Sequence, residues 1–228
     1  MKIASYNIRK AVGLDWRRDP HRIVDVLAEI DADIVCLQEA DKRLGERPGV
    51  LPLDRLRDEQ GYELARMGAG RRSHGWHGNA ILYRATSMSQ PKTERITLPS
   101  REPRGAIGAY FPDEGFAAIG AHLALTSGAR RQQVRTLCTH ADHSDHPTII
   151  AGDFNHWGQH LPAGGHTVVT PGLSFHASRQ IAALDRFILC GGIEKKEAYV
   201  HRSMAARQAS DHLPVVLEFA LLERSKKC

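Results

Sequence analysis

The 228-residue sequence has no long apolar run and no segment of low complexity. A membrane-spanning helix needs about 18 or more consecutive apolar residues, and a signal peptide needs an apolar stretch that the start MKIASYNIRK lacks. We therefore expect a cytoplasmic protein without a transmembrane segment. Peripheral contact with a membrane stays open, and a monomer is the expected state.

The sequence is also poor in the signatures of several common sites. Its four cysteines form no CxxC pair, and two of them stand within the apolar runs IVCLQ and FILCG, so we expect buried, reduced thiols. The sequence contains no HExxH motif, which would indicate a zinc site. No P-loop or dinucleotide glycine signature occurs, which disfavours chemistry based on ATP or NAD.

No linker rich in proline, glycine or serine divides the chain, so one domain spanning residues 1–228 is expected. A hydrophobic content of 42% and a charged content of 25% suit a folded protein with a sizeable core. The net charge of +5 favours phosphate-bearing partners, although many basic proteins bind no nucleic acid.

The hydrophobic pattern predicts short strands and few helices. Helices are expected from Pro20, from about Asp54 to Gln60 with Gly61 as the stop, and after Ser127 as the N-cap. The expected strands cover residues 2–8, 34–37, 80–83, 106–111, 116–125, 148–151, 187–189 and 215–219. Two similar halves of this kind indicate two packed sheets with helices outside them.

Polar residues end or interrupt the buried strands at many places. They are Asn7, Glu39, His122, Asp153, Asn155, Asp185, Asp211 and His212. Each has an ordinary explanation when taken alone: a strand end, a helix cap, a turn or a core histidine. All of them together point to a common cleft, because a buried polar side chain needs a partner or an open site.

The chemistry of this set is specific. Its four carboxylates and two amides offer hard oxygen ligands, which suit Mg²⁺ or Mn²⁺ and are poor ligands for zinc. A hard cation beside histidine and asparagine donors suits displacement at phosphorus, where negative charge is neutralised and water is activated. The residues therefore predict metal-dependent phosphoester chemistry.

Seven motifs follow one another in a recognisable order: SYNIR, DIVCLQEAD, HGNAILYR, HLAL, AGDFNHW, LDRFIL and SDHLPVV. From Met1 to about Phe219 the chain resembles the endonuclease/exonuclease/phosphatase superfamily, in particular its deoxyribonuclease-like metal-dependent phosphoesterases. GDFN and SDHLP, together with LQE, are the specific parts. The resemblance implies an α/β fold, a four-layered α/β sandwich in which two mainly antiparallel β-sheets pack face to face and are flanked by helices.

The resemblance also implies which residues bind the metal and the phosphate. Glu39 resembles the main metal carboxylate, with Asn7 and Asp211 near the same Mg²⁺ ion, for which Mn²⁺ could substitute. Arg104 and Asn79 are the expected contacts to the substrate phosphate, and Asn79 would also shape the site.

The remaining residues are implied in catalysis. Asp153 would position or deprotonate the attacking water, and Asn155 would hold a phosphate oxygen. His212 would contact the scissile phosphate or act as the general base, with Asp185 orienting it. His122 resembles a histidine that helps to protonate the leaving group. Whether Asp153 or His212 is the base stays open.

The substrate is less constrained. The sequence IAALDRF stands where the inositol phosphatases carry PAWCDRI, and Ala183 stands where abasic-site enzymes place a tryptophan. Trp76 and Trp157 could stack a base or meet a lipid head group. The arginines that could track a nucleic-acid backbone are Arg71, Arg72, Arg101, Arg104, Arg130 and Arg131. A basic solvated surface explains these arginines equally well.

Three hypotheses result. The first is a divalent-metal-dependent phosphodiesterase, a nuclease acting on DNA or RNA. The second is an enzyme for a phospholipid head group or another small phosphoester. The third is a non-catalytic binding module, which the presence of Glu39, Asp153 and His212 disfavours.

Overall fold

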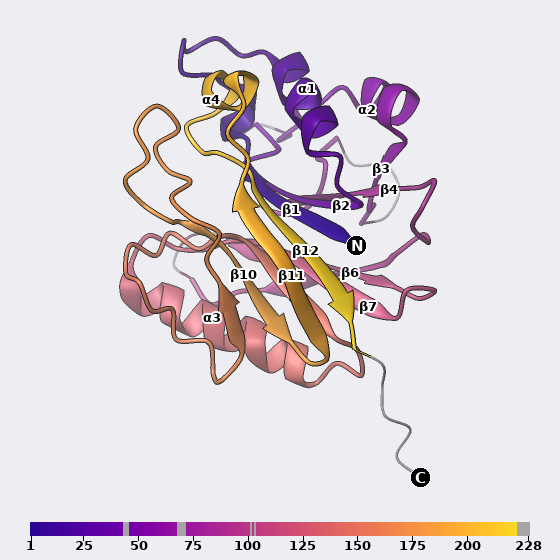
Figure 1. The fold of residues 1–228 in the computed structure, drawn as a ribbon, viewed down its shortest axis with the longest axis vertical. Helices are drawn as coiled ribbons and strands as arrows, with labels where there is room; N and C mark the ends of the chain where they lie inside the picture. The colour runs from indigo at the N-terminus through magenta and orange to yellow at the C-terminus, as the bar shows by residue number, and fades with distance from the viewer. Residues whose placement is uncertain (43–45, 68–71, 101, 103, 223–228) are drawn as a thin grey trace.

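The computed structural model describes residues 1–42, 46–67, 72–100, 102 and 104–222. Twelve strands in these residues form two six-stranded sheets that pack face to face, with helices on the outer sides (Figure 1). This arrangement confirms the expected four-layered α/β sandwich. No helix among these residues is long and apolar enough to cross a membrane.

The first sheet combines the two ends of the chain. Its order is β11–β12–β1–β2–β4–β3, and β1 and β2 are its parallel pair. The strands are β1 Lys2–Asn7, β2 Ile34–Gln38, β3 Tyr62–Leu64, β4 Ala80–Arg84, β11 Ile193–Val200 and β12 Val215–Leu221. The helices on this side are α1 Pro20–Ile30, α2 Leu53–Gln60 and α4 Met204–Ala209, and a short 3-10 turn, η1 Arg9–Ala11, follows β1 (Figure 1).

The second sheet comes from the middle of the chain. Its order is β5–β6–β7–β8–β10–β9, and its parallel pair is β7 and β8. The strands are β5 Lys92–Thr97, β6 Gly105–Phe111, β7 Phe116–His122, β8 Thr148–Asp153, β9 Thr167–Val169 and β10 Asp185–Cys190. The long helix α3 Ser127–Asp142 covers its outer face (Figure 1).

Successive side chains of β8 and β10 point to opposite faces of the second sheet, and they therefore belong to two layers of the core. In β10, Phe187 and Leu189 join the cluster between the sheets, whereas Ile188 joins the cluster beneath α3. The side chains of β8 alternate in the same way, with Ile149 facing the first sheet and Ile150 facing α3. Both faces of these strands are therefore buried, which explains why they read as continuous apolar runs.

The predicted elements agree with the structure except at their ends. Asp19 caps α1 through a hydrogen bond to the His21 amide, and Gly61 ends α2 with φ of 69°. The predicted N-cap Ser127 is wrong: the N-cap is Thr126, and its side chain makes no capping hydrogen bond. The strand expected to reach residue 125 ends at His122, and the Leu123 amide beyond it donates to the Asp153 carbonyl.

Candidate active site

The candidate residues meet at one end of both sheets because of strand direction. The parallel strands β1 and β2 end together at Asn7 and Gln38, so Glu39 follows beside Asn7. The parallel strands β7 and β8 end together at His122 and Asp153, which are paired in the ladder. The antiparallel strand β10 begins at the same end, with Asp185 opposite Asp153.

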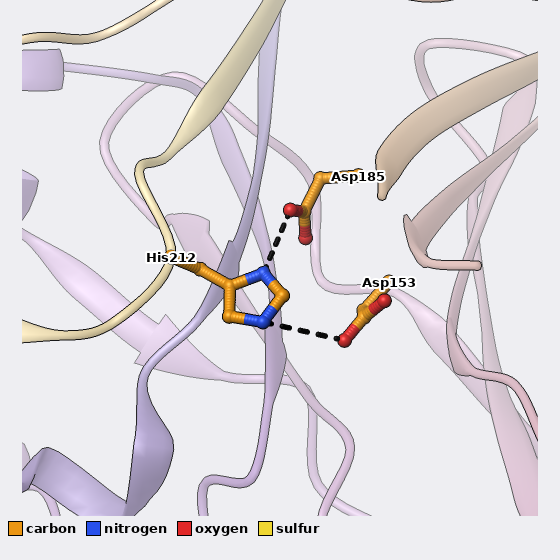
Figure 2. A group of neighbouring side chains, drawn as sticks. All are labelled: Asp153, Asp185 and His212. Carbon is orange, nitrogen blue, oxygen red and sulfur yellow. Dashed lines mark hydrogen bonds and ion pairs between the residues drawn. The ribbon is translucent and has the colours of Figure 1, made fainter. Parts of the chain in front are cut away.

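His212 lies between two carboxylates (Figure 2). Its Nδ1 is 2.8 Å from Asp185 Oδ2, and its Nε2 is 3.7 Å from Asp153 Oδ2. Asp185 is fully buried, and the same Oδ2 accepts a hydrogen bond from Ser174 Oγ at 2.6 Å. The Asp185 contact fixes the imidazole ring, so that Nε2 points towards Asp153.

Asp153 receives groups from both sheets. Its Oδ2 accepts a hydrogen bond from Asn7 Nδ2 at 3.0 Å, and His122 Nε2 lies 3.5 Å from the same oxygen. Its Oδ1 accepts the Asn155 backbone amide at 2.9 Å. Asn155 adopts φ of 50°, and its Nδ2 donates to the Leu123 carbonyl. The Asp153 carboxylate therefore contacts residues from the ends of β1 and β7 and from the loop before β12.

The two histidines differ in charge. Burial lowers the pKa of His122 to about 4, and Arg104 and His212 add to the effect of burial, against the opposing charge of Asp153. Burial also lowers the pKa of His212, but the charge and hydrogen bond of Asp185, with the charges of Asp153 and Asp211, raise it to about 9 overall. At neutral pH, His122 is therefore neutral and His212 is an imidazolium.

The predicted metal ligands lie beside cationic side chains. Lys10 Nζ pairs with the Glu39 carboxylate, and Arg9 Nε lies 3.4 Å from Asp211 Oδ2. Asn7 Oδ1 accepts the Arg9 amide at 3.1 Å. Arg9, Lys10 and Glu39 all have positive φ, a left-handed backbone that costs about 1–2 kcal/mol per residue. Such strain is found where a backbone serves a site.

Oxygen ligands at this end of the sheets fit a divalent cation. Glu39 and Asp211 supply carboxylates and Asn7 an amide oxygen, a donor set that suits Mg²⁺ or Mn²⁺. Asp153, Asp185 and His212 also offer ligand atoms that lie within 4.8 Å of one another, close enough to hold a metal ion. In Figure 2, however, the two carboxylates approach opposite nitrogens of His212, the arrangement of a proton relay.

A cavity of about 400 Å³ opens at the candidate site. Its lining includes His122, four cationic side chains and three carboxylates: Lys10, Lys42, Arg47, Arg104, Glu39, Asp41 and Glu102. Arg104 Nη1 donates to the His122 carbonyl at 3.4 Å, so its guanidinium stands at the wall of the cavity.

Asn79 has a different position. Its Nδ2 donates to the carbonyls of Gly105 and Trp76, which ties β4 of one sheet to β6 of the other. The side chain is buried, and its Oδ1 has no hydrogen-bond partner among the described residues. Asn79 therefore connects the two sheets through hydrogen bonds. Its contact with the substrate phosphate stays a prediction.

Several residues of the site were not singled out by the sequence. Arg9 and Lys10 lie in the SYNIRK segment just after Asn7, and their closeness to Asn7 in the sequence could have indicated that they belong to the site. Ser174 lies in a long loop without any motif, and only the fold brings it to Asp185. Arg186 follows Asp185 in the LDRFIL motif and is almost fully buried, which its type alone would not suggest.

The predicted basic residues are scattered. Arg72 pairs with Glu46, and Arg130 donates to the carbonyls of Ala124 and Leu125 at the start of α3. Arg131 is exposed, whereas Arg71 and Arg101 lie outside the described residues. Trp76 is half-buried beneath Arg95, and Trp157 is 63% exposed.

Comparison with known proteins identifies the family of this chain. The model of the Endonuclease/Exonuclease/phosphatase family matches residues 4–212. The chain is similar to the "Uncharacterized protein YbhP" of Escherichia coli (strain K12), with 26% identity over an alignment of 248 positions that covers 96% of each chain.

Two solved structures show the same fold at low identity. D. rerio TDP2, complexed with single strand DNA product, has a TM-score of 0.69 and 18% identity, covering 96% of this chain and 98% of that chain. The Bacteroides thetaiotaomicron mannosyl-6-phosphatase Bt3783 has a TM-score of 0.63 and 19% identity, covering 97% of this chain and all of that chain. With its motifs, its two-sheet sandwich and its buried Asp153–His212–Asp185 group, the chain belongs to the endonuclease/exonuclease/phosphatase family of phosphoester hydrolases.

Proposed function

We propose that the chain is a Mg²⁺-dependent phosphodiesterase that cleaves DNA or RNA by attack of water on phosphorus. The observation that carries this proposal is the position of Asp153. One carboxylate oxygen faces two histidines of different charge, at 3.5 Å from His122 and 3.7 Å from His212. Hydrolysis of a diester needs both a proton acceptor for water and a proton donor for an alkoxide leaving group.

Each residue has a role in this proposal. Asp153 positions the water and accepts its proton, because a histidine with a pKa of about 9 is already protonated at neutral pH. His212 contacts the scissile phosphate as an imidazolium and donates its Nε2 proton to the alkoxide leaving group. The proton that Asp153 takes from water then returns to His212, whose Nε2 lies 3.7 Å away. This assignment replaces the expected role of His122 as the proton donor, because a histidine with a pKa of about 4 is neutral at pH 7. His122 and Asn155 hold phosphate oxygens, and Arg104 supports them from the wall of the cavity.

The metal belongs to the other half of the site. Asn7, Glu39 and Asp211 would hold it, and when bound it would neutralise phosphate charge and lower the pKa of the attacking water. Lys10 and Arg9, which pair with Glu39 and Asp211, would then release these carboxylates and turn to the substrate.

A small phosphoester is the second candidate. The cavity of about 400 Å³ is of the size that holds a small molecule, and the mannosyl-6-phosphatase Bt3783 shares the fold. A phospholipid head group falls into the same class of substrate.

A substrate panel tests the proposal. The full chain is assayed with Mg²⁺ or Mn²⁺ on single-stranded DNA, duplex DNA, RNA, phospholipids, inositol phosphates and two chromogenic esters. We expect cleavage of polynucleotides, and faster hydrolysis of bis(p-nitrophenyl) phosphate than of p-nitrophenyl phosphate. The isosteric variant Asp153→Asn serves as the inactive control. Monoester hydrolysis without any diester cleavage would refute the nuclease proposal and favour the small phosphoester.

A further inference from the structure

The loop after β8 carries an exposed tryptophan beside the catalytic group. Trp157 follows the Asp153–Asn155 segment, and its side chain is 63% exposed. Leaving an indole in water is unfavourable by roughly the hydrophobic free energy of its surface, and tryptophan is enriched at binding surfaces.

The backbone of this loop is held rigidly from below. Arg186 is almost fully buried, and its guanidinium donates to the carbonyls of His156, Gly158 and Gln159. These bonds fix the chain on both sides of Trp157. The Arg186 guanidinium therefore holds the backbone of this loop, and the backbone position of Trp157 is fixed as a result.

An aromatic contact leads from Trp157 to the catalytic histidine. The Trp157 ring packs edge-on against Phe175, with centroids 6.1 Å apart, and Phe175 lies 4.9 Å from the His212 ring. Phe175 itself is fixed, because its amide and carbonyl both bond to Ala182. Its backbone also pairs with that of His212.

A chain of contacts runs from the cavity, which is lined by four cations and three carboxylates, through His122, Asp153 and His212 to Phe175 and Trp157. In this order, the cations of the cavity come before Asp153 and His212, and the aromatic pair of Phe175 and Trp157 comes after them. A nucleotide chain matches this order, since its phosphates suit the cations and a base next to the scissile phosphate suits the indole.

We infer that Trp157, backed by Phe175, is a stacking platform for the base of a nucleotide next to the cleaved bond in single-stranded nucleic acid. This inference rests on the proposed nuclease function and deepens it. The free edge and face of the indole would accept any base, because every base offers a π-face. We therefore expect a preference for unpaired substrate and little preference among the bases.

Abasic scanning tests the inference. Single-stranded oligonucleotides with one defined cleaved bond carry a tetrahydrofuran residue at one position at a time. With the wild-type chain, one position next to the bond should lower kcat/KM by about fivefold to one-hundredfold. Trp157→Ala should cause a similar loss on the intact oligonucleotide and no further loss on the abasic one. Trp157→Phe should restore most of the rate, since it keeps an aromatic face.

The controls separate the alternatives. Met204→Ala removes another exposed apolar side chain, from α4, and should leave the abasic profile unchanged. Independent, multiplicative losses for Trp157→Ala and the abasic residue would overturn the inference while leaving the nuclease intact. A wild-type chain that cleaves no oligonucleotide would instead refute the proposed function. Binding to phosphatidylcholine–phosphatidylserine vesicles that Trp157→Ala abolishes, without coupling to a base, would reassign the indole to a lipid surface and overturn the inference.

Discussion

His122 and His212 approach the same oxygen, Asp153 Oδ2, and carry different charges at neutral pH. Their Nε2 atoms lie 3.5 Å and 3.7 Å from that oxygen, yet the pKa of His122 falls to about 4 and that of His212 rises to about 9. The difference has a structural origin, because His212 has a second carboxylate, Asp185, at its other nitrogen and His122 has Arg104 nearby.

The charges of these two histidines can be observed directly. In chelator, NMR titration of the imidazole signals should show His212 protonated at pH 7.5 and losing its proton near pH 9. His122 should stay neutral down to about pH 5. The variants His122→Asn and His212→Asn assign the signals. Two ordinary titrations near pH 6.5 would contradict this description of the site.

The neutral His122, whose side chain is 15% exposed, should also make the stability of the fold depend on pH in the acid range. Its folded pKa of about 4 lies below its unfolded value of 6.5, so the unfolded state binds more protons between these values. The stabilisation is present above pH 6.5 and is lost as pH falls towards 4. In chelator, the free energy of unfolding of the wild type should fall by about 2 kcal/mol more than that of His122→Gln between pH 8 and pH 5. Urea unfolding at the two pH values measures this, and parallel losses would disprove it.

Asp185 and His212 should act as one unit. His212→Ala should lower kcat by about 10²- to 10⁴-fold, the range for lost acid–base help. Adding Asp185→Asn should then change kcat little, because Asp185 acts through the 2.8 Å contact to His212. Circular dichroism checks that each variant folds. Multiplicative losses would show that Asp185 has a second role, such as metal binding.

Lys10 should compete with the metal for Glu39. Removing a cation about 4 Å from the site of a divalent ion should make the free energy of ion binding more favourable by at least about 1 kcal/mol. This corresponds to a roughly fivefold higher affinity for the ion. Lys10→Met should therefore tighten Mg²⁺ binding in titration calorimetry, although it lowers turnover. Glu39→Gln should weaken Mg²⁺ binding. Lys42→Met, which removes a cation from the same cavity without the Glu39 contact, is the matched control, and an equal effect there would refute the competition.

Arg186 should stabilise the loop that carries Trp157. Lysine offers fewer donors and cannot span the carbonyls of His156, Gly158 and Gln159. Arg186→Lys should lower the free energy of unfolding by about 2–4 kcal/mol, since buried carbonyls lose their partners. Hydrogen exchange of residues 156–160 should rise more than that of β8. Unchanged exchange in this loop would contradict the role of Arg186.

The fold was predictable where burial dominates the sequence. The central strands β1, β2, β8 and β10 are apolar on both faces, so both their existence and their position follow from hydrophobic runs. The strands β5 and β11 escaped prediction because they are largely exposed and rich in charge, as edge strands are. Each of them pairs along its length with a neighbouring strand, β5 with β6 and β11 with β12.

The candidate site was predictable for a related reason, since its residues interrupt those same apolar strands. Arg9 and Lys10 were missed because their positions depend on a left-handed turn that no local pattern indicates. Ser174 and Phe175 reach the site from a loop whose path is decided by tertiary packing. The charges of the histidines likewise depend on neighbours far away in sequence.

The candidate groups are divided between the two sheets, and this division has a mechanical consequence. Asn7 on β1 bonds to Asp153 on β8, and His212 beside β12 contacts Asp185 on β10, so each pair spans the sandwich. A ligand that touches both partners acts as a clamp on the two layers. Saturating ligand should accordingly resist the separation of one layer from the other and leave each layer's own hydrogen-bonded ladder unaffected.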